Sequence, residues 1–101
     1  MPKRTPPTHP RLERQLHALG KRLRAARLRR TMTQAQLAER VGVSLPTVAK
    51  LEAGNPTTSM ATLVRVLSVL GLEGDLELIG TTDHVGRELQ DQNLRRPSRS
   101  R

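Results

Sequence analysis

The chain has 101 residues, a formal net charge of +9 at pH 7, and no Cys, Trp, Tyr or Phe, and its length allows one small domain. Without cysteine it has no disulfide, thiol nucleophile or Cys-ligated zinc, and without aromatic residues it has no platform for stacking single-stranded bases. No apolar run approaches the roughly 20 residues that cross a bilayer, and no signal-peptide pattern is present, so we expect a soluble cytoplasmic protein without a membrane partner.

The positive charge is concentrated towards the N-terminal end. Residues 1–30 contain ten Lys or Arg and one acidic residue, whereas residues 31–80 contain three basic and five acidic residues. Residues 81–101 contain five basic and three acidic residues. So uneven a distribution favours a polyanionic partner, above all nucleic acid. A solvated basic helix without a partner is the alternative.

Helical patterns follow a proline-rich start. Residues 1–10 hold four prolines and predict a disordered basic arm. Apolar residues then recur at helical spacing and predict helices over 11–30, 34–41, 45–53 and 60–70. The apolar residues expected to be buried in the first, second and fourth of these are Leu12, Leu16, Leu19, Leu23 and Ala26; Ala35, Leu37, Ala38 and Val41; and Met60, Leu63, Val66, Leu67 and Leu70.

Capping residues mark the ends of these helices. Thr33 and Gln36 have the spacing of a capping box, in which each side chain bonds the backbone N–H of the other residue. Ser44 and Ser59 are N-cap candidates for the two following helices. Gly42 allows the chain to reverse where a side chain would be strained.

The segment after the fourth helix has a different pattern. Residues 74–80 alternate charged and apolar side chains and predict a short β-strand. One strand needs a partner for its backbone groups, so we expect it to pair across a homodimer. The residues expected at this interface are Leu76, Leu78 and Ile79. An extension packed on the fourth helix is the alternative. Residues 81–101 predict a mostly disordered basic tail, in which residues 86–94 can form a transient helix.

The second and third predicted helices form a helix-turn-helix within a domain spanning residues 11–73. Ala38 has to be small because the third helix crosses close to it. Val48 and Leu51 anchor the third helix from behind, so that its other face points towards the major groove of DNA. The residues expected on or beside this recognition face are Ser44, Leu45, Pro46, Thr47, Ala49 and Lys50.

Three stretches carry a family resemblance: residues 23–27 (LRAAR), 33–44 (TQAQLAERVGVS) and 51–54 (LEAG). Together they resemble the XRE/Cro/C1-type helix-turn-helix family over about residues 19–72. The resemblance implies an all-α, lambda-repressor-like domain of four to five helices that binds a palindromic operator in double-stranded DNA as a homodimer.

The resemblance also implies roles for single residues. Gln34 matches a residue that holds a phosphate, although an ordinary first-turn glutamine is the alternative. Arg27 matches an arginine that pairs with the acid at Glu52 and can also touch phosphate, and we favour the structural pair. Lys50 reads a base or remains a solvated lysine. The remaining candidates for phosphate contact, Thr57 and Thr58, lie in a turn where such residues are common.

The recognition face departs from the family's usual polar readers. Leu45 and Pro46 have no side-chain hydrogen-bonding group and can only contact thymine methyl groups. Lys50 can reach guanine O6 and N7 or a phosphate. We therefore expect specificity to depend on apolar contacts, a few polar side chains and the shape of the DNA.

The end of the fourth helix and residues 76–79 resemble HipB-type antitoxins. This implies a repressor that autoregulates its operon at the nucleoid and binds a HipA-type kinase toxin. A stand-alone phage-type repressor and a protein-binding adaptor of the multiprotein-bridging-factor type are the alternatives. The three histidines lie outside any His/Asp/Glu cluster and no Gly-rich phosphate loop is present, so we expect no enzyme activity, metal or cofactor.

Overall fold

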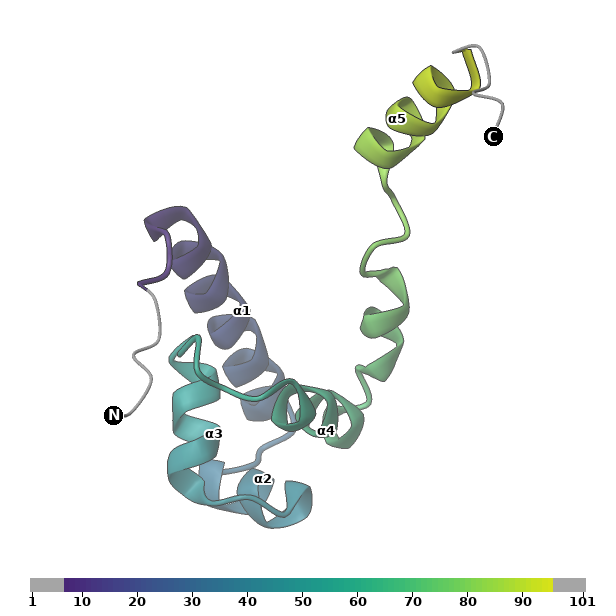
Figure 1. Ribbon diagram of the computed structural model, residues 1–101. Helices are drawn as coiled ribbons and strands as arrows, with labels where there is room; N and C mark the ends of the chain where they lie inside the picture. The colour runs from purple at the N-terminus through teal and green to yellow at the C-terminus, as the bar shows by residue number, and fades with distance from the viewer. Residues whose placement is uncertain (1–6, 96–101) are drawn as a thin grey trace.

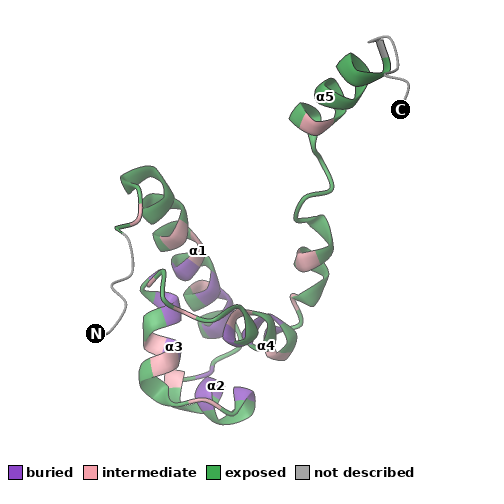
Figure 2. Cartoon of the chain, in the orientation of Figure 1, coloured by how far each residue is buried: buried purple, intermediate pink, exposed green. Residues whose placement is uncertain are grey.

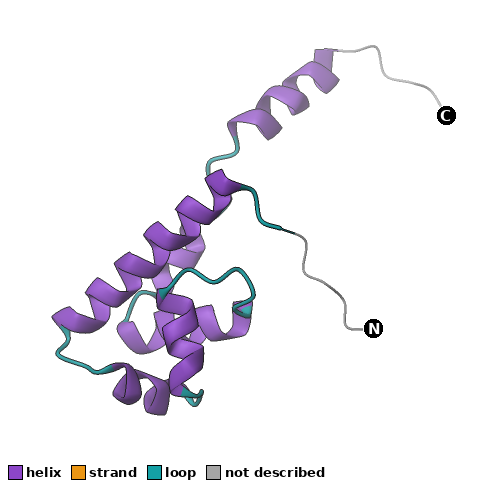
Figure 3. Cartoon of the chain, turned by 90° about the vertical axis from the view of Figure 1, so that its left-hand side faces the viewer, coloured by secondary structure: helices purple, strands orange, loops and turns teal. Residues whose placement is uncertain are grey.

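The computed structural model describes residues 7–95, which form helices and no strand (Figures 1 and 3). The elements in chain order are α1 (Pro10–Arg29), α2 (Gln34–Val41), α3 (Leu45–Glu52), α4 (Met60–Leu70), the 3₁₀-helix η1 (Glu73–Leu78) and α5 (His84–Arg95). The four helices predicted from the sequence agree with α1–α4 to within one residue at either end. The predicted arm over 1–10 lies mainly outside the described residues.

Side-chain caps define where the helices begin. The Thr33 hydroxyl accepts a hydrogen bond from the Gln36 N–H at 3.1 Å, and the Thr33 N–H donates to the Gln36 side chain at 2.8 Å. The capping box predicted for α2 is therefore confirmed. Ser44 and Ser59 cap α3 and α4 in the predicted way. Gly42 ends α2 with a φ of 82°, in the left-handed region that favours glycine.

The core lies where α1, α2, α3 and α4 meet (Figure 2). Val48 of α3 and Val66 of α4 are completely buried, and Ala38 is buried at the crossing of α2 and α3, as its small size predicted. The buried apolar residues are Leu23, Ala26, Met32, Leu37, Ala38, Val41, Val48, Leu51, Val66, Leu67 and Leu70. This set holds α3 in one orientation against the rest of the domain.

Three residues predicted to be buried are exposed. Leu12 lies in the first turn of α1, at the helix end that projects beyond the other helices (Figure 1). Ala35 lies in the first turn of α2 and faces outward. Met60 is the first residue of α4 and is 80% exposed. Each stands in a first turn, where the apolar pattern continues but no neighbouring helix covers it.

The predicted strand over 74–80 is wrong. Residues 73–78 form η1, in which the N–H of Asp75 donates to the Leu72 carbonyl at 3.0 Å. Leu72, Leu76 and Ile79 also have helical spacing, and all three line one groove of the domain. The chain supplies no second strand among the described residues, so the backbone of this segment satisfies its hydrogen bonds locally.

Residues 84–95 form α5, so the helix that the sequence allowed over 86–94 within a mostly disordered tail is present. The Asp83 carboxylate accepts the Gly86 N–H at 2.8 Å and so caps the start of this helix. Figures 1 and 2 show η1 and α5 extending from the helical domain as an almost fully exposed arm. The radius of gyration is 18.8 Å, against about 13 Å for a compact chain of 100 residues.

Candidate nucleic-acid interface

The two sides of α3 differ sharply in burial. Val48 and Leu51 are buried against the core, which confirms the predicted anchoring of this helix. On the opposite side Pro46 and Lys50 are exposed and Leu45 is 45% exposed. Thr47 and Ala49, which were also predicted for the recognition face, are half-buried. The structure thus presents one continuous face of α3 to solvent.

Two hydroxyl groups meet at the start of α3. The Ser44 and Thr47 side-chain oxygens lie 2.8 Å apart, and the Thr47 N–H donates to the Ser44 hydroxyl at 3.3 Å. One hydroxyl hydrogen is used between the two side chains, which leaves the other free for a phosphate or base acceptor. Ser44 is exposed, so this end of α3 can take part in a DNA contact.

A buried ion pair connects α1 with α3. Arg27 donates from Nε to Glu52 Oε2 at 2.7 Å and from Nη2 to Glu52 Oε1 at 2.9 Å, which makes the pair bidentate. Its third group, Nη1, donates to the Met32 carbonyl at 2.7 Å. Gln34 Nε2 donates to Glu52 Oε1 at 3.0 Å and brings α2 into the same network. Glu52 therefore organises three helices, and Arg27 occupies the structural position that the sequence favoured.

This network shifts the pKa values of both Arg27 and Glu52. The hydrogen bond to Glu52 raises the pKa of Arg27 despite the opposing effect of burial. Burial by itself would raise the pKa of Glu52, but hydrogen bonds from Arg27 and Gln34 and the charges of Arg27 and Arg24 outweigh it and lower the pKa. The pair is therefore ionised at neutral pH.

The lowered pKa of Glu52 predicts a loss of stability in acid. Above its ordinary value of 4.5 the carboxylate is charged in both states and contributes in full. As the pH falls through the lower pKa of the folded state this contribution is lost, because the unfolded chain binds the proton first. Urea unfolding between pH 5 and pH 3 should show a smaller decline for Glu52→Gln than for the wild type. Equal declines would contradict the prediction.

Gln34 is the first residue of α2, where a phosphate contact was predicted. The N-terminal end of a helix attracts anions through its free N–H groups and its dipole. Gln34 is half-buried, and its bond to Glu52 fixes the side chain there. Arg24 is exposed on α1 and close enough for its charge to act on Glu52. Arg24 was not among the residues predicted to contact DNA, although its place one turn before Arg27 in the sequence is a signal for it.

The turn before α4 does not present its threonines equally. Thr57 is exposed, but its hydroxyl donates to the Asn55 side chain at 2.6 Å. The Thr58 hydroxyl oxygen is buried without a hydrogen-bond partner among the described residues. The conformation of the turn directs this hydroxyl inward, so it has to turn outward before it can donate to a phosphate. Thr57 has to release Asn55 before it can donate to a phosphate.

The comparison with family models gives one match. The model of a helix-turn-helix family covers residues 23–76, more than half of the chain. The chain belongs to this helix-turn-helix family. The comparisons with curated proteins and with solved structures give no match.

Membership of the helix-turn-helix family places the candidate interface inside the matched region. The match runs from the last two turns of α1 into η1 and includes all of α2, α3 and α4. It supports a DNA-binding regulator of the XRE type. None of the helices between residues 7 and 95 has the length and apolarity needed to cross a membrane.

Proposed function

We propose that the protein is a sequence-specific transcriptional repressor that binds a palindromic operator as a homodimer and has no catalytic role. The observation that carries this proposal is the exposed face of α3, held in place by a core on its other side. In a dimeric helix-turn-helix protein the two recognition helices enter successive major grooves about one helical turn apart. Such a regulator acts in the cytoplasm, at the nucleoid.

The chemistry of this face determines how sequence is read. Leu45 and Pro46 can contact thymine methyl groups, and Lys50 carries the only formal charge within α3 on the exposed side. Gln34 and Arg24 add phosphate contacts that position the helix without reading sequence. Base recognition by one lysine, two apolar side chains and the Ser44–Thr47 hydroxyl pair leaves the remaining discrimination to the deformability of the operator.

Lys50→Ala should reduce binding to the preferred operator by about 1–3 kcal/mol, the range for a bidentate base contact. Binding to a scrambled duplex should fall much less. Titration of both duplexes by fluorescence anisotropy at one fixed salt concentration measures the two losses, because affinity for DNA varies strongly with salt. A preferred duplex is first selected from random DNA with the wild-type protein.

Gln34→Ala is the matched control for this experiment. A phosphate contact carries no sequence information, so this variant should weaken both duplexes equally. If Lys50→Ala also weakens both duplexes to the same extent, Lys50 contacts only phosphate. If the wild type shows no preferred duplex at all, the repressor proposal fails.

A narrower proposal assigns the protein to the HipB-type antitoxins, with a HipA-type kinase toxin as partner. The resemblance of the sequence after α4 to these antitoxins supports this proposal. The dimerisation strand that the resemblance implied is not formed there, because the segment is a 3₁₀-helix. Purification of the tagged chain together with the product of the neighbouring gene tests it. A neighbouring gene that encodes no kinase favours a stand-alone phage-type repressor.

A protein-binding adaptor is the second candidate function. The weakly polar face of α3 favours it, because Leu45 and Pro46 are exposed and apolar. An adaptor would bind genomic DNA fragments only at low salt and with no preferred site. Gel shifts at rising salt concentrations therefore distinguish it from the repressor.

A further inference from the structure

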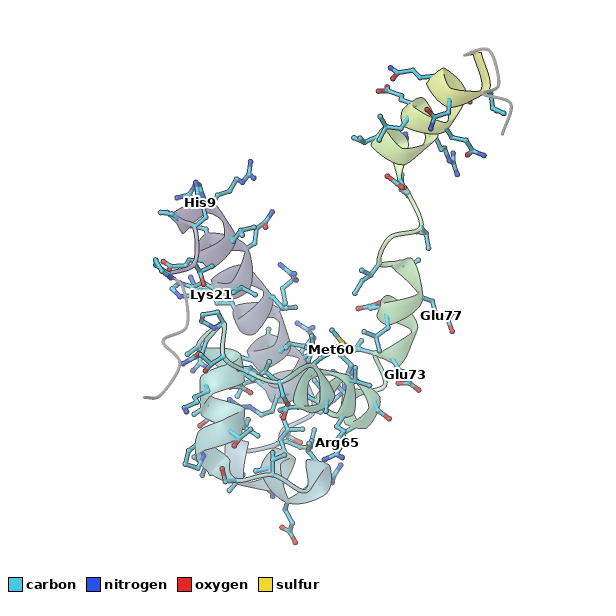
Figure 4. The ribbon with its side chains drawn as sticks, viewed as in Figure 1. His9, Lys21, Met60, Arg65, Glu73 and Glu77 are labelled. Carbon is cyan, nitrogen blue, oxygen red and sulfur yellow. The ribbon has the colours of Figure 1, made fainter. Side chains whose placement is uncertain are left out.

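An apolar groove lies on the side of the domain from which the C-terminal arm extends. It is formed by α1, α4 and η1 and has a volume of about 540 Å³. Leu19 of α1, Leu63 and Leu67 of α4, and Leu76 of η1 line it. Figure 4 shows Glu73 and Glu77 on the other side of η1, pointing away from the domain. The groove is thus an apolar channel beside the arm.

The arm carries a matching apolar surface. Val85 and Leu89 are one helical turn apart on α5 and therefore lie on the same face. They are 68% and 55% exposed, because α5 extends away from α1–α4 (Figure 1). Leu94 lies on the opposite face of α5. An isolated helix of 12 residues is marginal in water, so α5 requires a surface to cover its apolar face.

The groove carries two arginines, and one carboxylate of α5 lies beside its apolar stripe. Arg22 and Arg29 stand at the groove, together with Asp75. Over its whole length α5 contains two acidic residues, Glu88 and Asp91, and two basic residues, Arg87 and Arg95. Glu88 lies beside the stripe formed by Val85 and Leu89. When the apolar face of α5 lies in such a groove, the Glu88 carboxylate comes near Arg22 and Arg29.

From these matches we infer that α5 of one copy binds in the groove of a second copy, and that α5 of the second copy binds in the groove of the first. A specific interface uses about 20–30 residues a side, more than one helix of 12 residues provides. Reciprocal exchange doubles the contact and closes the assembly as a symmetric dimer. The inference rests on the proposed function in one respect: a palindromic operator has two half-sites, so the repressor needs two copies of the chain.

The oligomeric state of the full-length chain gives the first test. In sedimentation equilibrium the wild type should be a dimer at micromolar concentration, and Val85→Glu/Leu89→Glu should raise the dissociation constant at least tenfold. Leu94→Glu, on the opposite face of α5, is the matched control and should leave it unchanged. A monomeric wild type, or a dimer that tolerates the double variant, overturns the inference.

Disulfide trapping identifies the groove that α5 occupies. The chain has no cysteine, so introduced cysteines are unique. A mixture of Val85→Cys and Ala25→Cys chains should form a mixed covalent dimer on mild oxidation, because Ala25 lines the groove. When Leu94→Cys replaces Val85→Cys in the mixture, the yield of the mixed covalent dimer should be at least tenfold lower. If a chain with both cysteines at 25 and 85 closes an internal disulfide as a monomer, α5 occupies its own groove and the inference is wrong.

DNA binding separates this inference from the function on which it rests. A trapped dimer without a preferred operator would leave the exchange intact and reject the repressor. Specific binding by a chain that stays dimeric in the Val85→Glu/Leu89→Glu form would retain the repressor and reject the exchange.

Discussion

Replacing Arg27 by methionine should lower the free energy of unfolding by about 3–5 kcal/mol, because removal of one partner leaves a buried charge uncompensated. The Arg27 and Glu52 side chains are only 6% and 3% exposed. Methionine fills similar space but leaves the Glu52 carboxylate with the Gln34 amide as its remaining side-chain donor. Urea unfolding followed by circular dichroism at pH 7 measures the loss.

Two further variants show whether the pair itself is responsible. Arg24→Met removes an exposed cation from the preceding turn of α1 and should cost less than about 0.5 kcal/mol, as surface substitutions usually do. Arg27→Met combined with Glu52→Leu removes both charges and should recover most of the loss. A cost for Arg27→Met no greater than that of Arg24→Met would contradict the buried pair.

The same network connects stability with the candidate interface. Glu52 stands at the last position of α3 and accepts bonds from Arg27 on α1 and Gln34 on α2. The residue predicted to hold a phosphate is therefore fixed by the carboxylate that anchors the recognition helix. Helix orientation and phosphate contact depend on one charge, so this ion pair determines the spacing between the two candidate contact regions.

Local signals explain why the helices were predictable. Thr33, Ser44 and Ser59 each begin a helix through a bond to a backbone group three residues away, and such bonds depend on neighbouring sequence alone. The segment over residues 73–78 was not predictable in this way. Its leucines satisfy alternating and helical spacing at once, and only the groove between α1 and α4 decides between them.

In the candidate site, too, some features could be predicted from local sequence and others depend on how the helices pack. Which face of α3 is exposed follows from Val48 and Leu51, whose apolar spacing is readable from the sequence. The inward direction of the Thr58 hydroxyl depends on the path of an irregular turn. The bond from Gln34 to Glu52 joins residues 18 positions apart, so it exists only once three helices have packed.

Gly54→Ala should be far more costly than the same change at Gly71, although both glycines have nearly the same left-handed φ, 73° and 74°. A Cβ on Gly71 would meet no atom within 4 Å, so only the backbone conformation is penalised, by about 1–2 kcal/mol. A Cβ on Gly54 would lie 2.7 Å from backbone atoms of Leu16 and His17 in α1. This contact should add about 1–3 kcal/mol, the usual cost of overpacking.

The additional cost at Gly54 arises because neither partner can move. The obstructing atoms belong to the backbone of α1, and on the other side a Cβ on Gly20 would collide with the Glu52 carbonyl. The two glycines thus let α1 and the end of α3 approach closely enough for Arg27 to reach Glu52. Thermal unfolding of the two alanine variants measures the difference, and equal midpoints would show that this close approach is not required.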